Sequence, residues 1–197
     1  PVELRALQQL YNVTGGPQGA WLNDTGWHDN FLSDPCDGRS WFGIFDWHGY
    51  AEYGLQVSAC TAPDNATGWR SLQVLSLSGN GVAGPGNLGN GLRGNLGEWS
   101  MLRELSALRV IYVGNNPLLA GAIPALAGLT SLQYLGLPNN ALTGTIPALD
   151  GLTALQYLYL FNNSLTGTIP ALDGLTALQE LQLYSNSLSG TIPALDT

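Results

Sequence analysis

Aromatic side chains that recur in the C-terminal half of the chain have the residue types of a recognition surface. They lie within and beside a Leu-x-Leu step that returns every 23 residues, as in YLYLF at 157–161 and ELQLY at 180–184. Side chains alternate along a strand, so the leucines point inward and the residues around them point outward. The outward positions of the last three repeats hold Tyr134, Tyr157, Tyr159, Phe161 and Tyr184.

These aromatic residues predict one exposed patch on the concave face of a stacked sheet. Adjacent strands lie about 4.8 Å apart, so side chains in equivalent outward positions cluster. Contiguous exposed aromatic groups mark interaction surfaces, and tyrosine offers an apolar ring and a hydroxyl that suit protein or sugar partners. The alternative is that the tyrosines only stack along the sheet and stabilise it. The predicted ligand-binding residues are Tyr112, Tyr134, Tyr157, Tyr159, Phe161, Gln182 and Tyr184.

Two further columns of polar residues repeat with the same period. Hydroxyl groups at two-residue spacing resemble the flat arrays of ice-binding solenoids, but only three copies are present, so ice binding is a less favoured hypothesis. A column of aspartates indicates cation binding or, as the favoured alternative, a solvated acidic stripe. The hydroxyl pairs are Thr143/Thr145, Thr166/Thr168 and Ser189/Thr191, and the aspartates are Asp150, Asp173 and Asp196.

The chain contains little that indicates catalysis. No histidine accompanies a serine or cysteine nucleophile pattern, no glycine-rich phosphate loop opens a helix, and no carboxylate pair can be placed in a cleft. The two histidines, His28 and His48, lack the spacing of metal ligands, so exposed or hydrogen-bonded histidines are favoured over a metal site with Asp29, Asp34 or Asp46. We therefore predict no enzyme, no cofactor and no metal site.

The repeats that must position the aromatic columns run from about Leu72 to the C-terminus. Residues 144–166 and 167–189 are nearly identical. One such unit cannot bury its own leucines, but stacked units can, which indicates a solenoid. The Leu-x-Leu step predicts a short strand, and the leucines three residues apart before it predict a 3₁₀-like return. We expect Asn163 and Asn186 to bond backbone groups where the chain leaves the strand.

The region before the repeats is expected to form a cap that covers the end of the stack. Residues 1–13 have the apolar spacing of an amphipathic helix. Four of the six tryptophans follow in residues 21–47, and solenoids need capping units. A disulfide between Cys36 and Cys60 would close a loop of about 24 residues and contribute roughly 3 kcal/mol of stability.

Composition and charge exclude several classes of partner. The 197-residue chain is 45% apolar and 10% charged, with a net charge of −8 and no basic cluster, so nucleic acid and anionic membrane surfaces are poor partners. No apolar run approaches the roughly 20 residues that span a bilayer. Four N-x-S/T sequons beside two cysteines favour the secretory pathway, and hence N-glycosylation, over chance occurrence. The sequon asparagines are Asn12, Asn23, Asn65 and Asn162.

The repeats resemble the plant-type leucine-rich repeat, whose pattern is LxxLxxLxLxxNxLxGxIPxxLxxLxx. The resemblance is specific at residues 140–147, 163–170 and 186–193, where the asparagine, leucine, glycine and Ile-Pro positions match. The front of the chain is similar to the N-terminal cap of this family through Asp34-Pro35-Cys36, Trp41 and Cys60, although an insertion at about 45–53 separates the two cysteines more widely. The short Ala- and Gly-rich repeats resemble those of secreted algal and protist proteins.

This resemblance implies an α/β solenoid, a right-handed superhelix with a parallel sheet on its concave side and a helical, aromatic cap at residues 1–66. About five repeats, the last incomplete, would occupy 67–197. Members of the family are secreted or extracellular recognition modules and are generally not enzymes. We therefore expect an extracellular module that binds a protein or glycan through its concave face. The alternative is a structural subunit that assembles through an uncapped C-terminal end.

Overall fold

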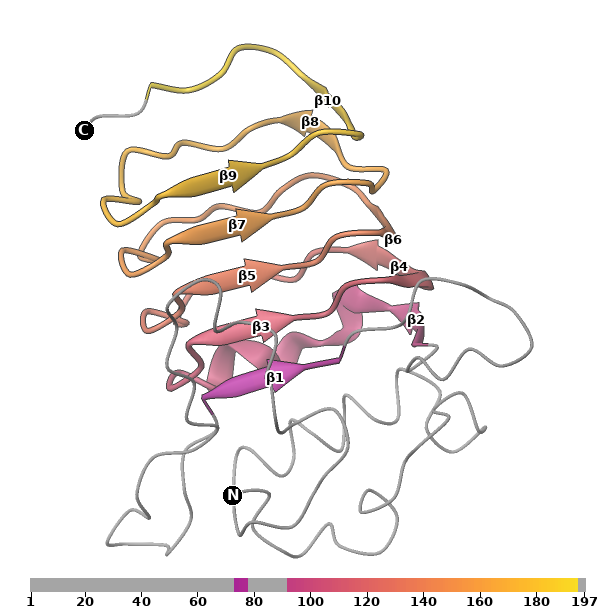
Figure 1. The fold of residues 1–197 in the computed structure, drawn as a ribbon, viewed down its shortest axis with the longest axis horizontal. Helices are drawn as coiled ribbons and strands as arrows, with labels where there is room; N and C mark the ends of the chain where they lie inside the picture. The colour runs from indigo at the N-terminus through magenta and orange to yellow at the C-terminus, as the bar shows by residue number, and fades with distance from the viewer. Residues whose placement is uncertain (1–72, 78–91, 195–197) are drawn as a thin grey trace, which may run out of the picture.

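The structure is a computed structural model that describes residues 73–77 and 92–194, and these form a stack of short parallel strands. Five strands from successive coils form one parallel sheet in the order β1-β3-β5-β7-β9. Figure 1 shows them lying one above another, from magenta to yellow along the chain. The strands at the Leu-x-Leu steps are therefore confirmed. Their bounds are β1 Val74–Ser76, β3 Val110–Tyr112, β5 Tyr134–Gly136, β7 Tyr157–Tyr159 and β9 Glu180–Gln182.

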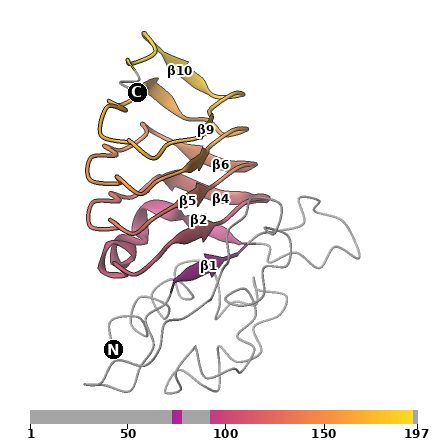
Figure 2. The same cartoon turned by 60° about the vertical axis from the view of Figure 1, so that its left-hand side comes forward.

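A second set of strands lies behind the first sheet and to its right in Figure 1. It comprises a three-stranded sheet, β2-β4-β6, and a two-stranded sheet, β8-β10. Two 3₁₀ helices, η3 Leu96–Glu98 and η4 Ser100–Glu104, lie between β2 and β3. Figure 2 shows the resulting coils as layers stacked on one another. The strand bounds are β2 Arg93–Asn95, β4 Asn116–Ala122, β6 Asn140–Thr143, β8 Thr166–Thr168 and β10 Ser187–Ser189.

Leucines fill the space enclosed by each coil. Leu135 and Leu158 point inward from their strands, and the leucines of the return segments join them in one continuous core. In the return, the Leu152 amide donates to the Leu149 carbonyl at 3.1 Å, and the Leu155 amide donates to the Leu152 carbonyl at 2.9 Å. Bonds between residues three apart are those of a 3₁₀ turn, so the expected 3₁₀-like return is confirmed. Because each coil covers the leucines of its neighbour, contacts between coils stabilise the fold.

An asparagine ladder links neighbouring coils, as the sequence predicts. The side-chain nitrogen Nδ2 of Asn140 donates to the carbonyls of Val113 at 2.6 Å and Leu137 at 3.0 Å, and its Oδ1 accepts from the Asn116 amide at 2.9 Å. Each amide therefore satisfies backbone groups of its own coil and of the coil before it. The same arrangement recurs at Asn116, Asn163 and Asn186.

The residue before each ladder asparagine adopts a left-handed backbone conformation. Asn115, Asn139, Asn162 and Ser185 have φ values of 59°, 56°, 55° and 55°. Asparagine tolerates this region better than most residues because its short polar side chain bonds locally. Asn139 Nδ2 donates to Asn115 Oδ1 at 2.7 Å, and Asn162 Nδ2 donates to Asn139 Oδ1 at 2.6 Å. A second, outer chain of amides therefore joins three successive turns.

Several predictions concern residues outside the described ranges and stay predictions. They are the cap and its boundary at residue 66, the disulfide, the two histidines, Asp196 and three of the sequons. Within residues 73–77 and 92–194, no helix is long and apolar enough to cross a membrane. Nor does any group of three or more His, Cys, Asp or Glu side chains in these ranges have an arrangement that could hold a metal ion. The residues left as predictions include Cys36, Cys60, Asn12, Asn23 and Asn65.

Candidate binding face

The outward columns predicted from the sequence are in register in the structure. One column joins Val74, Val110, Tyr134, Tyr157 and Glu180, and a second joins Ser76, Tyr112, Gly136, Tyr159 and Gln182. The residues between these columns pair with one another and contribute to the leucine core. We use the name aromatic face for the rings on this side of the sheet, which are those of Tyr112, Tyr134, Tyr157, Tyr159, Phe161 and Tyr184.

The predicted exposure of this face is wrong for two of its residues. Tyr134 is 0% exposed and Tyr159 is 5% exposed. Their ring centroids lie 5.3 Å apart with the planes at 83°, and the rings of Tyr112 and Tyr157 lie 6.1 and 5.9 Å from that of Tyr134. Aromatic rings favour such edge-on contacts because of their quadrupoles. Tyr134 and Tyr159 therefore form a small second core with the valines of the same sheet face, and they support the aromatic face from beneath.

Two glycines make room for the tyrosine rings. A Cβ atom at Gly136 would lie 2.6 Å from Cδ2 of Tyr112 and 2.7 Å from Cε1 of Tyr134. A Cβ atom at Gly114 would lie 2.8 Å from Cζ of Tyr112. These separations are shorter than real Cβ contacts, so any other residue at these positions would push the rings away. The glycines of the outward columns thus allow the neighbouring tyrosines to fold down onto the sheet.

The part of the aromatic face that a partner can reach lies at the ends of β7 and β9. Phe161 and Tyr184 follow these strands, and their rings are stacked with centroids 4.7 Å apart and planes at 9°. Tyr184 is 57% exposed, whereas Phe161 is half-buried. The Phe161 ring lies 6.5 Å from that of Tyr159. The stacked pair therefore continues the buried rings outward and presents the Tyr184 ring to solvent.

Hydrogen bonds hold a carboxylate beside these rings. The Tyr159 hydroxyl donates to Oε2 of Glu180, and Nε2 of Gln182 donates to Oε1 of Glu180 at 2.7 Å. The bond from Tyr159, followed by that from Gln182, lowers the pKa of Glu180, because both stabilise the charged form. On the preceding strand, the Tyr157 hydroxyl donates to Oε1 of Gln179 at 3.1 Å. Glu180 is therefore ionised at neutral pH and fixed in position.

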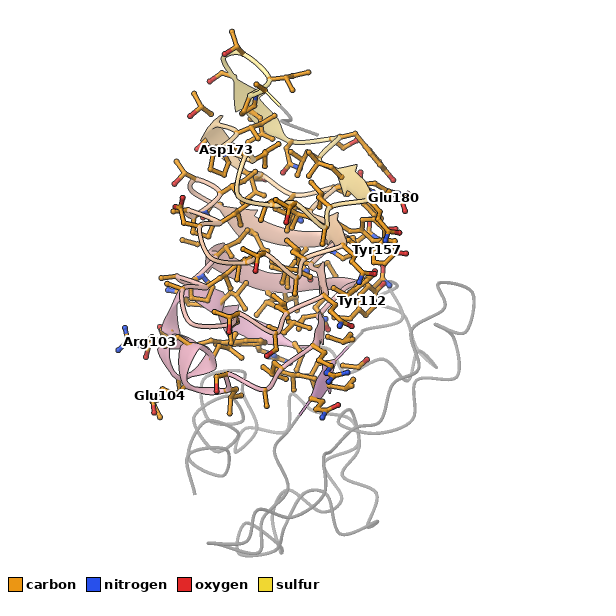
Figure 3. All side chains as sticks on the ribbon, turned by 90° about the vertical axis from the view of Figure 1, so that its left-hand side faces the viewer. Arg103, Glu104, Tyr112, Tyr157, Asp173 and Glu180 are labelled. Carbon is orange, nitrogen blue, oxygen red and sulfur yellow. The ribbon has the colours of Figure 1, made fainter. Side chains whose placement is uncertain are left out.

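Glu180 and Gln179 were not among the ligand-binding residues predicted from the sequence. Figure 3 shows Glu180 along the same side of the stack as Tyr112 and Tyr157. Among the described residues of the two outward columns, Glu180 is the one whose side chain carries a charge. That isolated charge in an otherwise aromatic and neutral column is the sequence signal that could have identified it.

The hydroxyl columns are present, but their predicted alignment is wrong. The 23-residue period set Thr145 beside Thr168, whereas the structure places Thr145 beside Thr166 and Thr168 beside Ser189. Strands of this sheet thus pair residues 21 apart, which shifts each coil by two residues. The shift places a threonine methyl against the glycine of the next coil, where a Cβ atom would approach within 2.8 or 2.9 Å. Equivalent hydroxyl groups of successive coils are therefore displaced by two residues along the strand and do not lie directly above one another.

The remaining polar candidates lie beside or away from the aromatic face. Asn162 is the sequon asparagine within the described residues, and it is exposed directly after Phe161. A glycan on Asn162 would border the aromatic face, and its presence stays a prediction. Asp150 and Asp173 are exposed. Figure 3 places Asp173 on the opposite side of the stack from Glu180, so the acidic column is separate from the aromatic face.

Comparison with known families identifies the repeating unit. A model of the family described as Leucine Rich repeats (2 copies) matches residues 130–166 and 153–197. Residues 130–197 are therefore similar to leucine-rich repeats. No curated protein matches the chain. The algal or protist origin predicted from the short Ala- and Gly-rich repeats is untested and stays a prediction.

Solved structures of leucine-rich-repeat ectodomains have the same fold. The ectodomain of the receptor kinase SOBIR1 from Arabidopsis thaliana aligns with a TM-score of 0.66 at 25% identity, over 96% of this chain and 82% of that one. The BIR3–SERK2 complex from Arabidopsis thaliana aligns with a TM-score of 0.63 at 24% identity, over 96% and 84%. A plant ice-binding protein aligns with a TM-score of 0.61 at 24% identity, over 94% and 48%. The last two likenesses concern the fold alone. The predicted leucine-rich-repeat solenoid is therefore confirmed.

Proposed function

We propose that the chain is an extracellular recognition module, not an enzyme, that binds a protein or peptide through the aromatic face. The observation that carries this proposal is the stacked pair of Phe161 and Tyr184, which leaves a large aromatic ring 57% exposed at position 184. Exposed aromatic groups are enriched at protein interfaces, and a ring in contact with water contributes little to the stability of the fold. The shared fold with the ectodomain of a receptor kinase supports an extracellular binding role.

The rings beneath the exposed pair make it a rigid surface. Tyr159 is buried and contacts Phe161, so the pair cannot collapse inward without displacing a packed side chain. A surface that is ordered before binding loses less conformational freedom when a partner arrives. Gln182 and Glu180 add hydrogen-bonding groups next to the rings. An apolar centre with a polar edge is the arrangement that protein interfaces share.

The test is a selection of peptides from a random display library on the full chain, followed by affinity measurements on variants. The double variant Phe161→Ala/Tyr184→Ala is expected to bind the selected peptides at least about tenfold more weakly, because exposed aromatic anchors dominate binding energy. The single variant Tyr184→Ala, at an exposed position, should lose affinity with little change in melting temperature, whereas Phe161→Ala also removes packing against Tyr159. Leu118→Ala is the matched control, because Leu118 is 60% exposed on β4, in the other set of strands.

Equal binding to the double variant and to the wild type would contradict the proposal. The same proteins applied to a glycan array address the alternative partner class. Glycan binding that is lost in the double variant, with no peptide selected, would show that the aromatic face recognises sugars instead. A protein partner remains the favoured class because the exposed ring and a charged carboxylate lie on the same side of the sheet, a combination that peptide side chains complement directly.

A further inference from the structure

Glu180 has hydrogen-bonding capacity that the described residues leave unused. An ionised carboxylate offers about four lone-pair positions. Within the described residues, Tyr159 and Gln182 occupy two of them, one on each oxygen. Both donors are neutral groups, so neither compensates the negative charge. The side chain is only half-buried, and its remaining lone pairs are therefore available to a group that arrives from solvent.

The carboxylate and the exposed ring pair belong to one continuous site. Tyr159 connects them, since its hydroxyl bonds Glu180 while its ring contacts Phe161, which stacks on Tyr184. Along the chain, residues 180, 182 and 184 alternate, and each two-residue step on one strand face is about 7 Å, so Glu180 and Tyr184 are about 13 Å apart along the chain. A partner segment that covers the Tyr184 ring can therefore reach the carboxylate with a neighbouring side chain.

We infer that the aromatic face receives an arginine side chain of its partner, hydrogen-bonded to the carboxylate of Glu180, while a neighbouring residue of the same partner covers the Tyr184 ring. This inference rests on the proposed function and names the chemistry of the partner. A guanidinium group is planar, stacks on aromatic rings and presents N–H groups in a fork that matches a carboxylate. A neutral side chain would leave the charge of Glu180 uncompensated once the partner excludes water from it.

The charge of the whole chain favours the same class of partner. Its net charge is −8, with a sequence pI of about 4.3. Such a surface attracts cationic segments and repels acidic ones, which raises the association rate of a basic peptide at low ionic strength. The arginine is thus selected twice, by the long-range charge of the chain and by the local pairing at Glu180.

The experiment uses the peptides selected on the full chain as described above. The tightest binder is synthesised with each arginine replaced in turn by citrulline, which keeps the planar shape and removes the charge. Each peptide is titrated against the wild type, Glu180→Gln and Glu104→Gln. Glu180→Gln retains an acceptor for Tyr159, and Glu104 is an exposed acid that Figure 3 shows away from the aromatic face.

One arginine is expected to lose about tenfold in affinity for the wild type when it becomes citrulline, and to lose little for Glu180→Gln. The Glu104→Gln variant should behave like the wild type. Selected peptides without a basic residue, or an equal citrulline effect on wild type and Glu180→Gln, would overturn the inference and leave the proposed function standing. Failure of the wild type to enrich any peptide over Phe161→Ala/Tyr184→Ala would overturn both.

Discussion

Replacing Asn140 with alanine removes three hydrogen bonds at once, two to the preceding coil and one within its own coil. The carbonyls of Val113 and Leu137 lose a donor, and the amide of Asn116 loses an acceptor. Asn140 is 9% exposed and Asn116 is 0% exposed, so water cannot replace the lost partners without entering the core. An unsatisfied buried polar group costs about 1–3 kcal/mol, and we therefore expect Asn140→Ala to lower the free energy of unfolding by about 3–5 kcal/mol.

The equivalent substitution in the last described coil isolates the contribution of burial. Asn186 makes the same three bonds, to the carbonyls of Leu160 and Leu183 and from the amide of Leu165, at 2.9, 3.0 and 3.0 Å. However, Asn186 is only half-buried, so water reaches the groups that Asn186→Ala exposes. We expect a loss of about 1–2 kcal/mol for this variant, close to the net contribution of hydrogen bonds in contact with solvent.

The measurement is urea unfolding followed by circular dichroism, with the midpoint and slope fitted for each variant. Asn139→Gly is the control for the outer amides, because glycine accepts the left-handed backbone at φ 56° while the bonds to Asn115 and from Asn162 are lost. It should cost no more than about 1 kcal/mol. If Asn140→Ala costs no more than Asn186→Ala, the ladder does not stabilise the fold by satisfying buried backbone groups.

Three further substitutions follow from the packing and the electrostatics. Gly136→Ala should cost about 1–3 kcal/mol in urea unfolding and shift the NMR ring signals of Tyr112, whereas Gly174→Ala, with no atom within 4 Å of its Cβ, should stay within about 0.5 kcal/mol of the wild type. Trp99 is buried, and its indole N–H has no hydrogen-bond partner among the described residues. Trp99→Phe should therefore lower the free energy of unfolding by no more than about 1 kcal/mol, and a loss near the 3–5 kcal/mol of an alanine truncation would contradict this. The pKa of Glu180 is lowered in the folded protein, so ionised Glu180 should make the wild type more stable than Glu180→Gln. This difference in the free energy of unfolding should be fully present above the usual glutamate pKa and disappear as the pH falls through the lowered pKa. A difference that increases at low pH would refute the assignment.

The direction of each side chain could be predicted from the sequence, because strand alternation is a local property. The step Tyr157-Leu158-Tyr159 requires that the leucine faces the core and the two tyrosines face the other way, whatever lies beyond them. The role of the ladder asparagines was equally predictable, since a chain that leaves a strand over a dry core must satisfy its backbone groups. The register of β1 to β9 confirms the side-chain directions, and the bonds of Asn140 confirm the role of the ladder.

Exposure and alignment depended on the space between coils and could not be predicted in the same way. Tyr134 is buried because glycine follows it at position 136 on the same strand and position 114 of the preceding coil is also glycine, which lets the rings of Tyr134 and Tyr112 fold over the same backbone. The slip of the threonine columns arises where a methyl group fits against a glycine of the next coil. Both effects depend on contacts between side chains about 23 residues apart that differ from one repeat to the next. A repeat pattern contains only the residues that the repeats share, so it does not predict these contacts.

The outward side chains have one more consequence, for the order in which the coils assemble. Residues 144–166 and 167–189 carry the same leucines, so a folding chain could skip one coil, loop out 23 residues and still build a leucine core. In the native order the Tyr134 ring contacts Tyr157 and Tyr159. After a skip it would instead face Glu180, and a carboxylate against a buried ring is strongly unfavourable. The outward side chains thus distinguish one coil from the next, and a chain with identical repeats throughout would lose this means of aligning its coils in the native order.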